Sequence, residues 1–356
     1  MNVKFLSVTT LMLAACMANA QSDTTKINRL QVIGSHNSYR RAIEPQLMKV
    51  LKEKDTQNRL QHIEYDHIPI DQQLDMGLRN LEVDIYPDSK GGRYAHPTGL
   101  DMAQGLEQYD PKGEMKKPGF KVFHMPDIDF RTWEYTFEGL LQSLKKWSDA
   151  NPGHAPIFIT LEPKSGGKSQ FGTEPEIFTE KVFDEMDKVI IKNLGKDKLI
   201  TPDMVRGKYK TLEEAVLNNN WPALADAKGR FMILLDNNKD LRDLYIKGHP
   251  SLKGRAVFTN SEPGTPEAAA LFRNDPEDTT ISGLVKKGYI IRTRADNSTT
   301  EARNNDYTHF EDAKKSGAQI ITTDYYLPSK MFESTYAIKF DDGGYVRINP
   351  VNGMRK

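Results

Sequence analysis

The sequence predicts an α/β fold, a single-domain (β/α)8 TIM barrel, on three observations. The chain has 356 residues, 38% of them hydrophobic, which is enough for one large core of this fold. Eight short apolar, β-branched segments alternate with amphipathic helical patterns in one uninterrupted chain. Polar residues able to carry chemistry end four of these segments, where the active sites of such barrels lie. An open doubly wound sheet is the main alternative, but the glycine-rich turn that it needs after its first strand is absent.

The predicted strands are mostly continuous apolar runs, as expected for parallel strands covered on both faces. Amphipathic helical patterns separate them, for example over 137–147 and 179–193. The long polar stretches 86–119 and 165–175 are expected to form walls or lids at the rim of the barrel. The eight predicted strands cover residues 30–34, 79–85, 120–124, 156–161, 231–235, 256–259, 289–292 and 318–322.

Residues 1–20 form a predicted signal peptide, in which Lys4 precedes an apolar stretch and then small residues. Two processing sites compete. Cleavage after Ala20 would release a soluble protein, whereas the lipobox-like Leu13-Ala14-Ala15-Cys16 would leave a lipid anchor on Cys16. We therefore expect an exported protein, periplasmic or secreted or anchored through Cys16, whose barrel domain covers residues 27–340.

Charge and cysteine usage exclude several classes of protein. The formal net charge is +0, so the chain lacks the basic excess that nucleic-acid binding needs. Cys16 is the only cysteine, so no disulfide is expected in the mature protein. No stretch beyond the signal peptide is long and apolar enough to span a bilayer. We expect a monomer with no nucleic-acid partner and at most peripheral membrane contact.

Four predicted strands end in related polar residues. Gly34-Ser35-His36-Asn37 ends the first strand, Glu82-Val83-Asp84 lies in the second, His124 ends the third and Glu162 follows the fourth. Together they supply two histidines, three carboxylates and one carboxamide, which suits a hard cation with acid and base groups. Zinc would instead want histidine or cysteine ligands. The sequence therefore predicts a metal-dependent phosphodiesterase.

The Glu82-x-Asp84 pair has a structural explanation as well as a functional one. Alternate residues of a strand share a face, so the two carboxylates point the same way and could form an exposed acidic edge. In an otherwise apolar barrel strand, however, two inward carboxylates would be costly without a cation. The metal site is the favoured interpretation.

The ordered set of motifs resembles the calcium-dependent phosphatidylinositol-specific phospholipase C family, notably its secreted bacterial branch. Any single motif is weak, but the set in this order is fairly specific, and the resemblance runs from about residue 31 to 326. The segments that carry it are Gly34-Ser35-His36-Asn37-Ser38-Tyr39, residues 78–85, Val122-Phe123-His124, residues 160–164, residues 290–296 and residues 322–326.

The family resemblance implies a mechanism as well as a fold. The 2-hydroxyl of inositol would attack the phosphorus and give a cyclic phosphodiester, while the cation and His36 stabilise the developing negative charge. His124 would protonate the departing glycerol oxygen, and Glu82 or Glu162 would accept the proton of the attacking hydroxyl. The resemblance implies one calcium ion whose ligands are Asn37, Glu82, Asp84 and Glu162.

Four further residues are candidates for substrate binding: Lys164, Arg292, Arg294 and Tyr325. The two arginines end the seventh strand and could bind phosphate or ring hydroxyls, or could pair with Asp296 or Asp324. The lysine could equally be a solvated surface charge. Asp236 ends the fifth predicted strand, where a helix-cap role is favoured over a role in the site.

Two other functions stay open. Glycerophosphodiester phosphodiesterases also use a barrel, a Glu-x-Asp pair and a later histidine, with Mg²⁺ as the expected ion. They carry His-Arg-Gly at the first strand, where this chain has Gly34-Ser35-His36-Asn37. A non-catalytic exported binding barrel is the alternative of another class. The completeness of the residue set argues against it.

Overall fold

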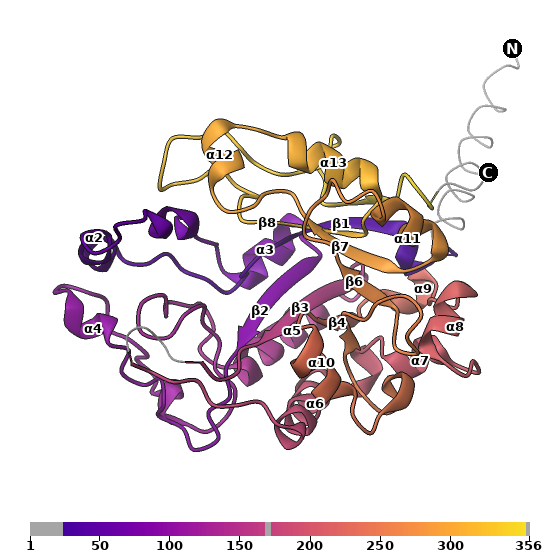
Figure 1. Cartoon of the computed structure of the whole chain (residues 1–356), viewed down its shortest axis with the longest axis horizontal. Helices are drawn as coiled ribbons and strands as arrows, with labels where there is room; N and C mark the ends of the chain where they lie inside the picture. The colour runs from indigo at the N-terminus through magenta and orange to yellow at the C-terminus, as the bar shows by residue number, and fades with distance from the viewer. Residues whose placement is uncertain (1–23, 168–171, 354–356) are drawn as a thin grey trace, which may run out of the picture.

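A nearly closed parallel barrel forms the centre of the protein, in the computed structural model that describes residues 24–167 and 172–353 (Figure 1). Its strands follow one another around the barrel in the order β5-β4-β3-β2-β1-β8-β7-β6, and an isolated parallel bridge between Asn260 and Ala270 joins the two ends. The predicted (β/α)8 barrel is thereby confirmed. The barrel strands are β1 (Leu30–Ser35), β2 (Asn80–Ile85), β3 (Ile157–Pro163), β4 (Phe231–Leu235), β5 (Phe258–Thr259), β6 (Ala270–Phe272), β7 (Ile290–Arg294) and β8 (Ile320–Thr323).

Helices surround the strands, with α5 and α6 on one side and α11 and α13 on the other (Figure 1). The two helices predicted over 137–147 and 179–193 are confirmed as α5 and α6, and each begins at a threonine whose side chain accepts a backbone hydrogen bond. The α-helices are α2 (Pro45–Lys52), α3 (Ile70–Met76), α4 (Gly99–Met102), α5 (Phe137–Ala150), α6 (Glu180–Leu194), α7 (Pro202–Arg206), α8 (Leu212–Leu217), α9 (Leu224–Ala227), α10 (Lys239–Ile246), α11 (Ile281–Lys287), α12 (Thr300–Asn304) and α13 (Thr308–Ser316). Short 3-10 helices are η1 (Ile27–Arg29), η2 (Arg59–Ile63), η3 (Glu114–Lys116), η4 (Lys196–Lys198) and η5 (Pro250–Leu252).

The strand predicted over 120–124 is wrong. Single antiparallel bridges join Lys121 to Tyr86 and to Thr136, and the segment lies in the long connection between β2 and α5. The neighbour of β2 in the barrel is instead β3, paired with it from Asn80 to Ile85. The apolar run at 120–124 reflects burial of its side chains inside that connection, not pairing in the barrel. His124 therefore lies on a loop and not at the end of a strand.

Two short strands were not predicted. β6 has three residues and completes the barrel beside β7, and β9 (Val346–Ile348) pairs antiparallel with β1. Three residues carry too little periodicity to be recognised as a strand from sequence. The number of barrel strands is thus right, although the sequence places one of them wrongly.

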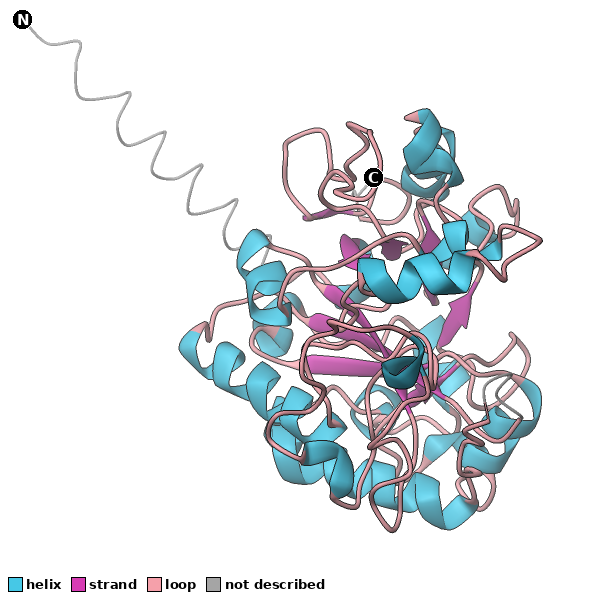
Figure 2. Cartoon of the chain, turned by 90° about the vertical axis from the view of Figure 1, so that its left-hand side faces the viewer, coloured by secondary structure: helices cyan, strands magenta, loops and turns pink. Residues whose placement is uncertain are grey.

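The register of the strands brings the polar residues to one rim. Asp84 pairs with Glu162, and Ser35, the last residue of β1, pairs with Leu81 on one side and Thr323 on the other. Because parallel strands end at the same edge, the residues that follow β1, β3, β4 and β8 meet there. The connections of this face lie over the strand ends in Figure 2.

Within residues 24–167 and 172–353, no helix meets the length and apolarity that a membrane crossing requires. The signal peptide and Cys16 fall on residues 1–20, which lie outside the described part of the chain. The predicted rim stretch 86–119 contains α4 and η3.

Candidate active site

His36 lies between two carboxylates that come from different strands. It directly follows β1, and its backbone N–H donates to the Thr323 carbonyl at 3.0 Å. Its Nδ1 is 2.9 Å from Oδ1 of Asp324, which follows β8, and its Nε2 is 3.2 Å from Oε1 of Glu82 in β2. The side chain is 18% exposed, so the ring is buried at its sides and reachable at the rim. Burial alone would raise the pKa of Asp324, but His36 outweighs this effect and the pKa is lowered.

His124 has a carboxylate partner from its own loop. Its Nδ1 is 2.7 Å from Oδ2 of Asp129, and Arg40 Nε donates to the same oxygen at 2.8 Å. Arg40 and Asp129 have fully buried side chains, whereas His124 keeps 18% of its side chain exposed. Burial lowers the pKa of His124 below its ordinary value, although Asp129 opposes the shift. With Nδ1 held by Asp129, Nε2 is the atom left for a substrate.

The predicted Glu82-x-Asp84 pair is buried within the barrel rim, with both side chains at 0% exposure. Burial opposes the charge of Glu82, but Arg292 and then His36 lower its pKa to about 2. Asp84 is different: burial raises its pKa well above the ordinary value, and Lys164 only partly offsets that effect. The two neighbouring carboxylates are thus compensated by different cations, and Asp84 is the less well compensated of the two.

Lys164 is not a solvated surface charge. Its Nζ is 2.6 Å from Oε1 of Glu162 and 3.2 Å from Oδ2 of Asp84. Burial disfavours the ammonium charge, but Asp84 and then Glu162 hold the pKa of Lys164 above its ordinary value. The lysine therefore stands beside the two carboxylates where β2 and β3 end.

The two arginines of β7 have different partners. Arg292 is buried and donates to Glu82 and to Asn274, so the expected alternative pairing with Asp296 or Asp324 is wrong for this residue. Arg294 is half-buried. Its Nε, like that of Arg292, is buried without a hydrogen-bond partner among residues 24–167 and 172–353, but within those residues Arg294 lacks the bonds to Glu82 and Asn274 that Arg292 makes. Burial opposes its charge, but Glu82 and Asp324 raise its pKa. Arg294 is therefore the more available cation for a ligand.

Two predicted site residues are engaged within the protein. The Asn37 side chain donates to the Tyr65 hydroxyl at 2.8 Å and accepts from the Tyr39 hydroxyl at 3.2 Å. Asn37 also has a left-handed backbone, with φ of 48°. Tyr325 is 1% exposed, and its hydroxyl donates to the Glu64 carbonyl at 3.4 Å.

Asp236 forms an acidic centre with Glu82 and Glu162. The helix-cap interpretation of this residue is wrong. It follows β4, and α10 has Asn238 as its N-cap. One carboxylate oxygen each from Asp236, Glu82 and Glu162 lie within 4.8 Å of one another. Burial, with Glu82 and Glu162 nearby, raises the pKa of Asp236 to about 6 against the opposing effect of Arg292. Its place at the end of a barrel strand was the sequence signal for this role.

The acidic centre has the chemistry of a site for a hard divalent cation. Oδ1 of Asp84 is buried without a hydrogen-bond partner in the described part of the chain, and Oδ2 has the Lys164 ammonium beside it at 3.2 Å. Glu82, Glu162 and Asp236 place carboxylate oxygens close enough to share one ion. Every donor is an oxygen, which calcium and magnesium prefer and zinc does not. The residues present therefore fit such an ion.

Two residues that sequence reasoning missed complete the site, namely Asp129 and Arg40. Asp129 lies five residues after His124, and Arg40 lies four after His36. No periodicity marks either of them, because their partnership depends on how the connection between β2 and α5 folds back against the turn after β1.

Comparisons with known proteins point to one family. The family model described as phosphoinositide phospholipase C, Ca²⁺-dependent, matches residues 25–350. A calcium-dependent phosphoinositol-specific phospholipase C from Pseudomonas sp., in a structure described as a myoinositol complex, is 18% identical over 92% of this chain and 97% of its own, with a TM-score of 0.53. A Ca²⁺-dependent phosphatidylinositol-specific phospholipase C from Streptomyces antibioticus is 18% identical over 86% of this chain and 97% of its own, also with a TM-score of 0.53. These two likenesses show a shared fold. A search of the curated proteins found no match.

Proposed function

The chain belongs to the Ca²⁺-dependent phosphoinositide phospholipase C family, whose members are phosphoric diester hydrolases, and we propose that it cleaves phosphatidylinositol-like phosphodiesters through a cyclic inositol phosphate. The observation that carries the proposal is the pairing of two rim histidines, each with its own carboxylate, around the acidic centre of Glu82, Glu162 and Asp236. His36 is paired with Asp324 and His124 with Asp129. Such pairs orient the rings for proton transfer at a defined nitrogen.

The acidic centre would hold the calcium ion that the family implies. Glu82 and Glu162 belong to both groups of candidate ligands, the group implied by resemblance with Asn37 and Asp84, and the close oxygen cluster with Asp236. When bound, calcium would stabilise negative charge on the phosphate and favour ionisation of the attacking hydroxyl. A position for the ion next to Asp84 would require Lys164 to move its ammonium group away, since it now contacts Asp84 and Glu162.

The residues of this chain would then divide the proton transfers. The inositol 2-hydroxyl loses its proton to Glu162 as its oxygen attacks phosphorus, because Glu82 is fully buried and engaged by Arg292 and His36. The bond from phosphorus to the glycerol oxygen breaks, and that oxygen takes a proton from Nε2 of His124 in its imidazolium form, whose charge Asp129 stabilises. Nε2 of His36 now faces Glu82, and in the reaction it would donate to a phosphate oxygen in place of that carboxylate and stabilise the developing charge.

Substrate recognition falls to the cations that border the acidic centre. Arg294 is half-buried and, within the described residues, lacks the bonds that tie Arg292 to Glu82 and Asn274, so it would bind phosphate or ring hydroxyls. Lys164 would meet the substrate phosphate once a cation takes its place between the carboxylates. The myoinositol complex described for the Pseudomonas enzyme supports an inositol headgroup. Arg292 and Tyr325, which are bonded within the protein, would support the rim without touching substrate.

The proposed setting of the reaction is outside the cytoplasm. The signal-peptide pattern at residues 1–20 supports export, either in soluble form or anchored through Cys16. We propose that the protein is a monomer and that it contacts membranes peripherally, where its lipid substrate lies.

The test is hydrolysis by protein that lacks residues 1–20, with calcium, with magnesium and with chelator, followed by phosphorus NMR of the product. Phosphatidylinositol and glycerophosphoinositol are the two substrates. A cyclic inositol phosphate that forms only with calcium is the expected result. Glycerol phosphate from the deacylated substrate would favour a glycerophosphodiester phosphodiesterase, and no product with any metal would favour a binding barrel.

A further inference from the structure

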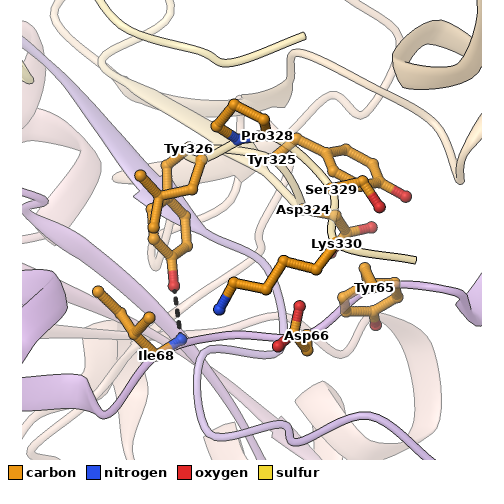
Figure 3. Close-up of a pocket in the computed structure, with 10 residues that line it drawn as sticks. Tyr65, Asp66, Ile68, Asp324, Tyr325, Tyr326, Pro328, Ser329 and Lys330 are labelled. Carbon is orange, nitrogen blue, oxygen red and sulfur yellow. Dashed lines mark hydrogen bonds between the residues drawn. The ribbon is translucent and has the colours of Figure 1, made fainter. Parts of the chain in front are cut away.

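The segment 64–68, between η2 and α3, lies against the turns that follow β1 and β8. The Tyr65 hydroxyl accepts from the Asn37 side chain at 2.8 Å. The Ile68 N–H donates to the Tyr326 hydroxyl at 3.2 Å, as the dashed line in Figure 3 shows. The Asp66 side chain faces Lys330 across the same hollow (Figure 3). This segment thus joins the His36 turn to the loop that carries Asp324.

His67 lies at the centre of the segment, and its side chain contacts the backbone of His36. Its Nε2 is 2.7 Å from the His36 carbonyl oxygen, and the residue is 2% exposed. A carbonyl oxygen only accepts, so Nε2 must carry the hydrogen of that bond. The ring stacks on Tyr326, with centroids 5.3 Å apart and planes at 19°. The imidazole has therefore one defined orientation and one defined tautomer.

The backbone of His67 is held as firmly as its ring. Its N–H donates to the Arg40 carbonyl at 3.1 Å, and its carbonyl accepts from Trp133 Nε1 at 2.7 Å. Arg40 also donates from its guanidinium to the carbonyls of Ile63 and Tyr65. His67 is therefore a rigid donor and cannot simply follow a movement of His36.

The other ring nitrogen shows that this arrangement has a cost. Nδ1 of His67 is buried and has no hydrogen-bond partner in the part of the chain that the structure describes. A buried polar atom without a partner is unfavourable, and a leucine or phenylalanine at this position would avoid it. What histidine adds over such a residue is the single hydrogen bond to the His36 carbonyl.

That hydrogen bond holds the backbone carbonyl of His36. The backbone N–H of His36 is already bonded to the Thr323 carbonyl, just after β1 ends. The next residue, Asn37, has a left-handed backbone, so the chain turns sharply and the His36 carbonyl is not paired with a neighbouring strand. With both its N–H and its carbonyl held, His36 can rotate only about its side-chain bonds.

We propose that His67 is a positioning residue for His36: its Nε2–H bond to the His36 carbonyl places the His36 imidazole between Asp324 and Glu82. His67 is too buried to touch substrate, so its effect on the reaction passes entirely through His36. The proposal deepens the proposed function and depends on it only where the readout is turnover. An error of about 1 Å in the position of a catalytic group can cost about 100-fold in rate.

The test compares two substitutions at position 67. His67→Leu removes the donor, whereas His67→Gln keeps an N–H at a similar reach from the backbone. We expect His67→Leu to lower kcat on phosphatidylinositol by about 10- to 100-fold with KM within twofold. We expect His67→Gln to restore kcat to within about threefold of the wild type, because the amide can donate to the same carbonyl. Equal loss of activity in both variants would overturn the proposal.

The matched control is His154→Leu. His154 is also buried, and its ring makes two hydrogen bonds, to the Ala155 carbonyl at 2.7 Å and the Ser148 hydroxyl at 2.8 Å, near the start of β3. We expect both His154→Leu and His67→Leu to unfold at a lower temperature than the wild type. We expect only His154→Leu to keep the wild-type kcat. If its kcat falls as far as that of His67→Leu, the effect is general destabilisation and the proposal fails.

A readout without turnover separates this proposal from the proposed function. The NMR signal of the His36 ring carbon and its proton is expected to shift or broaden in His67→Leu and to stay unchanged in His154→Leu. An unchanged His36 signal in His67→Leu would overturn the positioning role even if the wild type were an active phospholipase. A wild type without activity, together with a shifted His36 signal, would overturn the proposed function alone.

Discussion

The two histidines of the site are built in opposite ways. His36 follows a barrel strand, and its partner Asp324 follows the adjacent strand, so the pair depends on the register of β1 with β8. His124 and Asp129 belong to one loop, and the pair depends on Arg40, which donates to Asp129 from outside that loop. One half of the site is thus set by the sheet, and the other half by a buried ion pair that clamps a loop.

The difference teaches that equal chemistry does not imply equal stability. Both rings have a carboxylate at Nδ1 and 18% of the side chain exposed. Loss of Asp324 leaves the strands around His36 paired, whereas loss of Asp129 leaves the buried guanidinium of Arg40 without its charge partner. The predictions that follow test this contrast, from the largest expected effect to the smallest.

The largest effects are expected from removing either ring. His36→Ala and His124→Ala are each expected to lower kcat on phosphatidylinositol by about 100- to 10,000-fold, as loss of a general acid or of a charge-stabilising group does. Both variants should bind calcium like the wild type, which isothermal titration calorimetry checks. If a variant retains more than a tenth of wild-type kcat, the histidine that it lacks has no catalytic role.

The partner carboxylates should separate the two halves. Asp129→Asn is expected to reduce the free energy of unfolding by about 3 to 5 kcal/mol, because Arg40 becomes an uncompensated buried charge. Asp324→Asn should cost less in stability, because the His36 ring keeps Glu82 as a carboxylate partner and lies at the rim. Urea denaturation of both variants at pH 7 measures the difference. Equal losses would mean that the loop is not clamped as the structure indicates.

The pH dependence of stability should contain a contribution from His67. Burial lowers the pKa of His67 to about 4. Between about pH 6.5 and pH 4 the unfolded chain therefore binds a proton at this residue that the folded protein does not bind. Stability therefore falls as the pH drops from about 6.5 to about 4, by about 3 kcal/mol from this group. His67→Gln should lose correspondingly less stability over that range, as denaturation at several pH values will show. Parallel curves for the two proteins would contradict this.

Calcium affinity should depend on Asp84 and Asp236, two carboxylates that lie beside Glu162. Asp84 in β2 and Asp236 after β4 flank the strand that carries Glu162. Asp84→Asn and Asp236→Asn are each expected to weaken calcium binding by about 10-fold, because each removes a negative charge from the acidic centre. Isothermal titration with calcium alone measures both. Wild-type affinity in Asp236→Asn would restrict the ligands to the four implied by resemblance.

The smallest effect is expected at Asp296, whose carboxyl group accepts a hydrogen bond from the Asp324 backbone N–H. Burial first, and then Asp324, raises the pKa of Asp296 to about 8, so the folded protein keeps it protonated at pH 7. Its proton stabilises the fold fully below the unfolded pKa, and this contribution is lost as the pH rises to about 8. Asp296→Asn mimics the neutral acid, and we expect the free energy of unfolding at pH 7 to fall by no more than about 1 kcal/mol. A large loss would mean that Asp296 carries charge beside His36.

Sequence reasoning placed His36, Glu82 and Glu162 on strands whose ends meet at one rim, and the structure brings these residues together there. It also named His124 but placed it wrongly on a strand over 120–124, because burial in a loop produces the same apolar run as a barrel strand. Asp129 and Arg40 carry no periodic signal, so their role could not be predicted.

The sequence by itself determined the barrel, most of its strands, and the residue types that reach its rim, because hydrophobic periodicity and strand ends are local properties of the chain. Only the tertiary structure decided the partners: Glu82 with Arg292, Lys164 with Asp84 and Glu162, and His67 with the His36 carbonyl. Such partners are distant in sequence, and burial and charge decide among several chemically equivalent choices only once the barrel has closed.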